Sequence, residues 1–395
     1  MWEVRTERYV SVDRRITIHS KSKSFDEEIS SDGYARVPTL VPDFHDKGGS
    51  YARSTWINVI QPSNDYHDHD IAVIFPTNLW QPGFPHLQSS ERLTITREGW
   101  VIPKQYTIGY SLLRPIPGRK AMIEWFEMRG INAVPSEAGQ VAAQVISSAG
   151  NLLACGMFAD RETVQLLNSM AESHSEQRRE GKPVRRVAPD RAKHRDEIKQ
   201  HFAERAKRSF GYWNSLEYFL ERSVFRAGLR VQCPTCAYYN WFDLDAIGYN
   251  LNCSRCLNEF RLSQAPHDLA SFEWFYRVIG PFAAPDYVRG GYAVALTLRC
   301  IAERHESELT WSTGLELKEL GCEVDFAGWY RRGSRLFESE REEPVFLVGE
   351  AKSFGLNAIN KQSIDNFRLV AEQFPGSIMI VSSLKPIADY SPKRA

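Results

Sequence analysis

Cys233–Cys236 reads Cys-Pro-Thr-Cys and Cys253–Cys256 reads Cys-Ser-Arg-Cys, with sixteen residues between them. This spacing is typical of a site in which four thiolates hold one zinc ion. Each pair can place two sulfurs about 2.3 Å from the ion, which completes a tetrahedron without an open position. We therefore expect a structural zinc site whose ligands are Cys233, Cys236, Cys253 and Cys256.

Residues 231–263 resemble a zinc ribbon, because short alternating segments follow each cysteine pair. One interpretation is that the metal replaces a hydrophobic core too small to fold alone. Another is that the ribbon presents Tyr239, Trp241 and Arg255 to bases or phosphates. A redox-active cysteine pair is a third interpretation, but two pairs at ribbon spacing disfavour it.

Beyond residue 268 the chain predicts a compact α/β domain that extends to residue 395. Apolar periodicity and alternation indicate the element order αβββαβ. The expected helices cover residues 291–305 and 358–373, and the expected strands cover residues 308–317, 322–330, 344–352 and 377–382.

Chemically active side chains fall on two of these strands. Glu350 and Lys352 are two residues apart, so alternation places them on one face of the third strand. If the second strand is its neighbour, Asp325 can meet them. Two carboxylates and the Ala351 carbonyl offer the hard oxygen ligands that Mg²⁺ or Mn²⁺ prefers. Lys352 can then orient a water molecule and offset charge on a phosphate.

The layout of residues 268–385 resembles the PD-(D/E)xK nuclease superfamily, a restriction-endonuclease-like group. Glu323–Phe326 (Glu-Val-Asp-Phe) looks like its second-strand segment, and Val348–Ser353 (Val-Gly-Glu-Ala-Lys-Ser) resembles its Glu-x-Lys strand. Gln362 resembles a polar residue of the following helix. The resemblance implies a magnesium-dependent deoxyribonuclease with catalytic residues Asp325, Glu350, Lys352 and Gln362.

The sequence departs from the superfamily pattern in the helix before the first strand. Many members carry a metal-supporting Glu near its beginning, where this chain has Gly-Tyr-Ala at residues 291–293. Glu303 or Glu323 could substitute, so the sequence leaves one or two catalytic metals open. The alternatives are a binding module with an inactive nuclease fold, a repair or recombination nuclease, and an ordinary surface salt bridge beside a sheet.

The first half of the chain predicts two further regions. Residues 1–118 are predicted to form a β-rich domain, with strands expected near residues 15–18, 56–60, 71–75 and 93–96. Residues 119–230 form a helical connector that contains a charged linker at about 175–195. The whole chain is therefore expected to be a multidomain α+β protein.

The composition limits the function classes. The 395 residues contain 49 Lys and Arg and 49 Asp and Glu, so the whole chain has no strong positive field and nucleic-acid binding must be local. We found no nucleophile elbow, phosphate-binding glycine loop or dinucleotide fingerprint. No membrane-spanning stretch or secretory signal is evident, so the cytoplasm is expected.

The partners expected from the resemblance are DNA, a protein partner in a bacterial anti-phage or anti-plasmid defence system, and a second copy of the chain. A dimer would suit a nuclease that cuts both strands with one site per chain. We expect the N-terminal domain or a partner to gate the activity, while the sequence leaves DNA or RNA, strand preference and sequence specificity open.

Overall fold

The computed structural model divides the chain into two compact units. Unit 1 contains residues 1–140, 150–153 and 293–395, and unit 2 contains residues 141–149 and 154–292. Among the described residues, every helix is too short or too polar to traverse a lipid bilayer. With a few side chains excepted, the structure describes residues 117–171, 191–208, 211–265, 273–303, 308–331, 344–353 and 361–384, and elsewhere the backbone of short strands.

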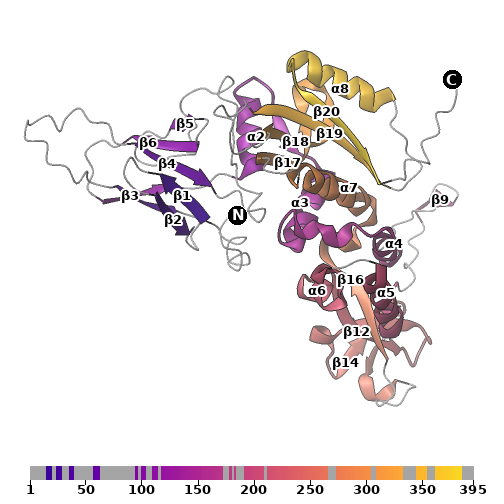
Figure 1. Cartoon of the computed structure of the whole chain (residues 1–395). Coiled ribbons are helices and arrows are strands. Elements are labelled where there is room, and N and C mark those ends of the chain that lie inside the picture. Colours follow the sequence, from indigo (N-terminus) through magenta and orange to yellow (C-terminus); the bar gives the residue numbers. More distant parts are fainter. Residues whose placement is uncertain are drawn as a thin grey trace, which may run out of the picture. The chain divides into compact units, whose positions relative to one another are not determined.

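The N-terminal part of unit 1 is made of antiparallel strands (Figure 1). Five form one sheet in the order β2-β1-β4-β6-β5, and β3 pairs with β7 in a second sheet. The strands expected near residues 15–18, 56–60 and 93–96 are confirmed as β1, β4 and β5, and the strand expected near residues 71–75 lies outside the described residues. The strands are β1 (Arg15–His19), β2 (Ser24–Glu28), β3 (Ala35–Thr39), β4 (Ile57–Pro62), β5 (Thr94–Thr96), β6 (Gly99–Pro103) and β7 (Gly109–Leu113).

The C-terminal part of unit 1 is a mixed sheet in the order β20-β19-β18-β17-β8. The pairs β17–β18 and β18–β19 are antiparallel, while β19 and β20 are parallel and joined through α8. The expected order αβββαβ over this region is confirmed, although its first helix begins earlier than expected. The elements are α7 (Pro285–Ala302), β17 (Glu308–Leu317), the 3₁₀ turn η8 (Lys318–Leu320), β18 (Cys322–Arg331), β19 (Val345–Lys352), α8 (Lys361–Gln373) and β20 (Ile378–Ser383).

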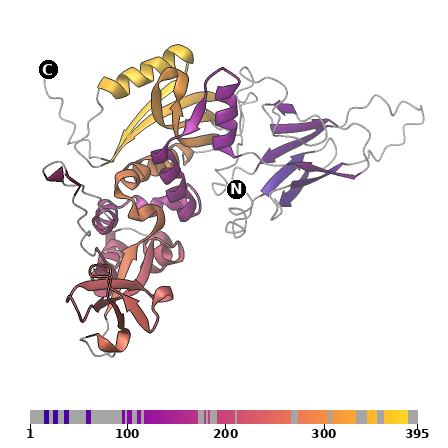
Figure 2. The same cartoon turned by 180° about the vertical axis from the view of Figure 1, so that it is seen from behind.

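Helices cover both faces of this sheet. Figures 1 and 2 show, from opposite sides, α8 on one face and α7 on the other. Burial on both faces explains why β19 begins with the apolar run Val345–Val348. On the α8 face, α2 (Gly118–Glu127) adds to the core through an aromatic cluster. Its members are Trp125, Phe126, Trp329, Phe346 and Phe374.

The segment that contains α2 and β8 (Ala133–Pro135) belongs to this sheet, although we expected it in a helical connector. β8 pairs with β17 and extends the sheet by one strand. The start of α3 (Glu137–Ala149) is tied to the same strand, because the Thr313 hydroxyl donates to the Gly139 carbonyl over 2.7 Å. The sequence pattern suggested a boundary after residue 118. Because of this long-range strand pairing, the first segment of unit 1 extends to residue 140.

Unit 2 combines helices with a four-stranded antiparallel sheet in the order β11-β16-β12-β13. Of the two expected ribbon strands, β13 forms a hairpin with β12 within this sheet, and β15 forms a second hairpin with β14. The sheet thus also contains strands from both sides of residues 231–263. The elements are η2 (Ala154–Phe158), α4 (Arg161–Met170), β11 (Lys193–His194), α5 (Arg195–Arg208), η3 (Tyr212–Asn214), α6 (Leu216–Glu221), β12 (Phe225–Gln232), β13 (Tyr239–Asp243), η4 (Leu244–Ala246), β14 (Asn250–Asn252), β15 (Glu259–Arg261), η5 (Leu262–Gln264), β16 (Trp274–Val278) and η7 (Gly280–Ala283).

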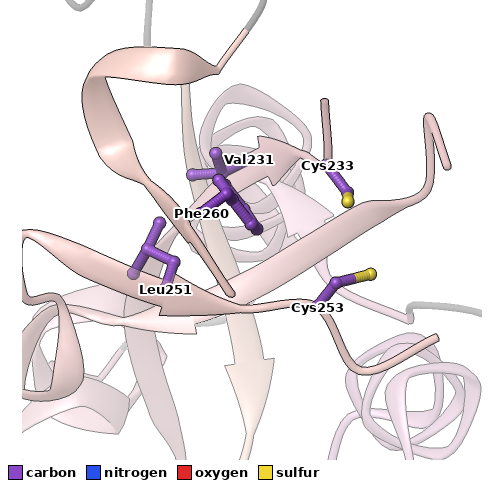
Figure 3. Packing of buried hydrophobic residues seen from close by; sticks show 5 residues of the cluster. All are labelled: Val231, Cys233, Leu251, Cys253 and Phe260. Atoms are coloured by element: carbon purple, nitrogen blue, oxygen red, sulfur yellow. The ribbon is translucent and has the colours of Figure 1, made fainter. Parts of the chain in front are cut away.

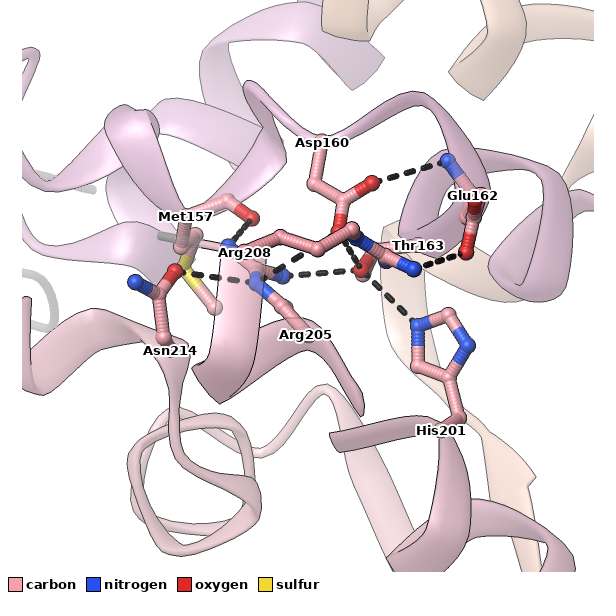
Figure 4. A network of polar contacts seen from close by, with 8 residues as sticks. All are labelled: Met157, Asp160, Glu162, Thr163, His201, Arg205, Arg208 and Asn214. Carbon is pink, nitrogen blue, oxygen red and sulfur yellow. Dashed lines mark hydrogen bonds and ion pairs between the residues drawn. The ribbon is translucent and has the colours of Figure 1, made fainter. Parts of the chain in front are cut away.

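A buried arginine joins the helices of unit 2 (Figure 4). The Arg205 guanidinium donates to Asn214 Oδ1 and Thr163 Oγ1, both over 2.9 Å, and to the Met157 carbonyl over 2.7 Å. Asp160 lies 3.9 Å from Arg205 and caps the start of α4. Because its donors are bonded, the buried charge links α4, α5 and η3, and we assign it a structural role.

Part of the expected charged linker at 175–195 lies outside the described residues. Within it, the two-residue strands β9 (Arg178–Arg179) and β10 (Lys182–Pro183) pair with each other. Its last residues form β11 and the start of α5 and thus belong to unit 2.

Candidate functional site

The two predicted carboxylates face each other across neighbouring strands. The β18–β19 ladder pairs Phe326 with Gly349, so one step further along this register Asp325 lies opposite Glu350. Opposite residues of an antiparallel pair share a face of the sheet. The Ala351 N–H also donates to Asp325 Oδ2 over 2.7 Å, which fixes the aspartate against the end of β19.

Lys352 and α8 complete the site on this face. The Lys352 ammonium forms an ion pair with Glu350 Oε1. The Ser363 hydroxyl donates to the same oxygen over 2.9 Å. Glu350 is only 9% exposed, and these two contacts compensate the burial of its charge. The structure therefore brings Asp325, Glu350 and Lys352 together, as the sequence predicted.

The surroundings of Asp325 disfavour its charged form. Burial, followed by the nearby charge of Glu350, raises its pKa to about 6, and the Ala351 N–H and Lys352 oppose the shift. Two close carboxylates in a desolvated position favour a proton or a cation between them. The site thus has the charge and donor atoms for binding a cation. The contact of Ala351 with Asp325 uses its N–H, and ligation through its carbonyl stays a prediction.

Ser363, which the sequence did not single out, contacts Glu350, whereas the predicted Gln362 does not. The Gln362 side chain is exposed and donates to Asn366 Oδ1 over 2.9 Å along α8. Its neighbour Ser363 is buried and contacts Glu350. A signal was present in the sequence, because Ser363 shares an i, i+4, i+7 stripe with the buried Phe367 and Val370. A lone polar residue on an apolar helix face needs a polar partner.

The two glutamates considered as metal-supporting substitutes lie in different places. Glu323 is two residues before Asp325 on β18, and its charge contributes to the raised pKa of Asp325. Glu303 follows the end of α7 and pairs with Arg299 over 2.5 Å. Glu323 is therefore the one that acts on the carboxylate site electrostatically.

A pocket lies on the opposite face of the C-terminal sheet. This pocket of about 520 Å³ opens between α7 and β20, lined by residues that include Leu296, Thr297 and Ile380. Leu347 of β19 also lines it. Because side chains alternate along a strand, Glu350 points to the other side of the sheet, where α8 lies. The carboxylate site is consequently separate from this pocket.

The four cysteines of the predicted metal site converge in unit 2. Their sulfurs all lie within 4.8 Å of one another, and this is the one such group of three or more Cys, His, Asp or Glu ligands among the described residues. Cys233 and Cys256 sulfurs are 3.7 Å apart, and those of Cys236 and Cys253 are 3.6 Å apart. Four sulfurs about 2.3 Å from one ion are about 3.8 Å apart in a tetrahedron. The cluster therefore has the dimensions of a four-thiolate metal site.

Two equivalent backbone turns position these sulfurs. Ala237 and Leu257, each directly after the second cysteine of a pair, have positive φ values of 54° and 59°. Their N–H groups donate to the carbonyls of Cys233 and Cys253 over 3.0 and 2.9 Å. The left-handed residue closes each turn so that both cysteines of a pair face the same point. This local geometry is what Cys-x-x-Cys spacing predicts.

Polar groups around Cys253 favour its thiolate form. Burial raises the pKa of Cys253, but the N–H groups of Cys256 and Arg255 and the Asn240 amide outweigh it and bring the pKa to about 6. Asn240 also accepts from the Ser254 N–H over 2.9 Å, which ties the second turn to β13. A thiolate is the form that binds a metal ion.

A small apolar cluster supports the cysteines. Figure 3 shows Cys233 and Cys253 beside each other, with their sulfurs turned away from Val231, Leu251 and Phe260. These five residues are nearly all of the buried core of the two hairpins.

Comparison of the chain with models of known protein families, with curated proteins and with solved structures finds no match.

Proposed function

We propose that the chain is a metal-dependent nuclease that hydrolyses phosphodiester bonds, with DNA as the expected substrate. The observation that carries the proposal is the convergence of Asp325, Glu350 and Lys352 on one sheet face at the end of β19. The resemblance to PD-(D/E)xK nucleases motivates the assignment, and the contacts of these residues support it. Mg²⁺ or Mn²⁺ is the proposed catalytic cofactor.

Each residue has a distinct proposed role. Asp325 and Glu350 hold the metal ion, which supplies charge stabilisation and an activated water when bound. Ser363 keeps the Glu350 carboxylate in place through its hydroxyl. Lys352 releases Glu350 to the metal and directs its ammonium at the phosphate, where it offsets developing negative charge.

Zinc is the proposed occupant of the cysteine cluster. Four thiolates at tetrahedral spacing leave no open coordination position, so the role is structural. The combination of this site with a nuclease and an N-terminal β-rich region favours a gated effector of bacterial defence, in which a partner or the N-terminal region controls cutting. Cytoplasmic localisation and a homodimer belong to this proposal.

Cleavage assays on supercoiled plasmid, linear duplex, and single-stranded DNA and RNA test the proposal. We expect wild-type protein to cut with Mg²⁺ or Mn²⁺ and not without a divalent ion. Lys352→Ala should lower the rate at least about 100-fold, because it removes a charge at the reacting phosphate. Lys318→Ala is the matched control, since Lys318 pairs with Glu316 beside the β17–β18 turn. Cutting that survives in Lys352→Ala, or its absence from wild type on every substrate, would count against the proposal.

A further inference from the structure

One face of the β11-β16-β12-β13 sheet carries a concentration of aromatic and basic side chains. The register pairs Arg230 with Trp241 and Gln232 with Tyr239, and on the other side Arg226 with Arg277 and Gly228 with Phe275. Because opposite residues of antiparallel strands share a face, these side chains lie together. We call this surface the aromatic–basic face and define it by Arg226, Arg230, Tyr239, Trp241, Phe275 and Arg277.

The rings and guanidinium groups of this face are layered on one another. The Arg230 guanidinium lies 4.9 Å from the centre of the Tyr239 ring and 5.4 Å from that of Phe275. The Arg277 guanidinium lies 5.1 Å from the Trp241 ring. Such pairs present flat, cationic surfaces, which suit stacking against a planar ring.

The opposite face of the same sheet supplies the core, so the aromatic–basic face is not needed for it. Phe225, Tyr276 and Val278 point to that other side and are buried. There Phe225 packs against Phe202 of α5 and Phe219 of α6. On the aromatic–basic face Arg226 is exposed and Tyr239 is 36% exposed.

Gly228 allows the indole of Trp241 to lie against the sheet. A Cβ at Gly228 would come within 2.4 Å of Trp241 Cε2 and 2.3 Å of the Phe242 carbonyl oxygen. The Trp241 ring N–H donates to the Phe275 carbonyl over 3.4 Å. The ring is thus fixed beside Phe275 and Arg277 before any ligand binds, which reduces the entropy lost on binding.

We propose that the aromatic–basic face binds single-stranded nucleic acid, with bases stacked on Tyr239, Trp241 and Phe275 and phosphates near Arg230 and Arg277. Aromatic rings combined with cations are the general means by which proteins bind unpaired strands without sequence preference. In a duplex the base faces are already stacked, so these rings favour single strands. Arg226 of the same face pairs with Asp243 over 2.7 Å.

This proposal extends the nuclease proposal by naming the substrate form, but binding does not require cleavage. Anisotropy of a dye-labelled oligonucleotide of about 12 nucleotides would be measured with Lys352→Ala protein in magnesium-free buffer. Adding Tyr239→Ala should weaken binding by about 5- to 150-fold, the effect of one lost stacking ring. Arg230→Lys keeps the charge but loses the planar group, so it should weaken binding less.

Tyr249→Ala is the matched control. Tyr249 is 63% exposed and has Arg261 5.6 Å from its ring, but it lies outside the sheet, next to β14. This change should leave binding within twofold, while unlabelled single strands should displace the probe better than duplex. The amount of bound zinc and the midpoint of unfolding show whether each variant is folded. If Tyr239→Ala is not folded, Arg230→Lys replaces it as the test.

The proposal is overturned if the oligonucleotide does not bind at low salt, or if the Tyr249 and Tyr239 changes weaken binding equally. Unchanged binding in the variants of the aromatic–basic face would overturn it as well, and would leave a protein partner as the ligand to examine there. Binding that depends on Tyr239 in a chain that cuts no substrate would refute the nuclease proposal alone. If the chain cuts nucleic acid but its binding is unchanged in the Tyr239 and Arg230 variants, only the proposal about the aromatic–basic face is refuted.

Discussion

The cysteine cluster and the carboxylate site are constructed in opposite ways. The four cysteines are placed by two local turns, each closed within five residues by a left-handed Ala237 or Leu257. Asp325 and Glu350 meet only because β18 and β19 pair in one register. The geometry of each cysteine pair is therefore set within a few residues, whereas the carboxylate site depends on pairing between two strands of a larger sheet.

The cores around the two sites differ in the same sense. The buried cluster of the hairpins contains Val231, Leu251 and Phe260 together with two of the cysteines themselves. The sheet of unit 1 is stabilised by the cluster around Trp125 and Trp329. A metal ion bound by the cysteines would therefore supply stability to the hairpins, while the ionised form of Asp325 costs the sheet stability, as its raised pKa indicates.

The largest effect is expected from removing one thiolate of the cysteine cluster. Cys253→Ser should abolish stoichiometric metal binding and destabilise unit 2 by on the order of 5 kcal/mol, because the hairpins have little other core. The C-terminal sheet of unit 1 should keep its amide protection. Metal content by mass spectrometry and hydrogen exchange would measure both effects.

Cys300→Ser is the control for this change. Cys300 is an exposed free cysteine on α7 and lies in unit 1. Its substitution should leave metal content and hydrogen exchange of unit 2 unchanged. Retention of the metal by Cys253→Ser with wild-type stability would show that the cluster is not a structural metal site.

A glycine next to Glu350 tests whether the carboxylate site depends on strand register. An added Cβ at Gly349 would lie 1.8 Å from Phe326 Cζ, so Gly349→Ala must displace that ring or shift the strands. We expect a loss of about 1–3 kcal/mol in unfolding free energy and a fall in any cleavage activity. Chemical denaturation would measure the first effect.

Gly290→Ala is the corresponding control, because a Cβ at this position of α7 meets nothing within 4 Å. Alanine favours a helix over glycine by about 1 kcal/mol, so this variant should be as stable as wild type or more stable. If the two glycine variants are equally stable, the packing of Phe326 against β19 is not what holds the carboxylates together.

The sequence predicted most of what is local and less of what is distant. The cysteine ligands follow from spacing alone, and the C-terminal strands follow from alternation and apolar runs. Alternation also placed Glu350 and Lys352 on one face. The prediction that Asp325 lies beside them assumed that its strand neighbours the strand of Glu350. The order β19-β18-β17 satisfies this assumption.

What could not be predicted depends on contacts between remote segments. β8 pairs with β17 although about 180 residues separate them in the sequence. β16 pairs with β12 although both cysteine pairs lie between these strands in the sequence. Short strands such as β8 have too few residues for a periodic signal. One interpretation of the sequence named Tyr239 and Trp241 of the aromatic–basic face, but it missed Phe275 and Arg277, because these come from a strand outside the ribbon pattern.

The smallest effects are expected from substitutions in α8, where the motif resemblance indicates Gln362 and the structure indicates Ser363. Ser363→Ala removes the hydrogen bond to Glu350, so it should lower the cleavage rate by about 5- to 10-fold, equivalent to about 1 kcal/mol. Gln362→Ala removes an exposed contact with Asn366 and should leave stability within about 0.5 kcal/mol of wild type. Rates under matched metal concentrations would compare the two variants.

The concentration of metal needed for half-maximal activity separates the possible roles. If Ser363 positions Glu350, Ser363→Ala raises this concentration, and Ser363→Thr, which retains a hydroxyl, restores part of the loss. The resemblance implies that Gln362 is catalytic. If Gln362 acts on the substrate and not on the metal, Gln362→Ala lowers the rate without changing the metal requirement. A larger effect at Gln362 than at Ser363 would mean that α8 contributes through its exposed face, so motif position would then be a better guide to function than the contacts within the folded site.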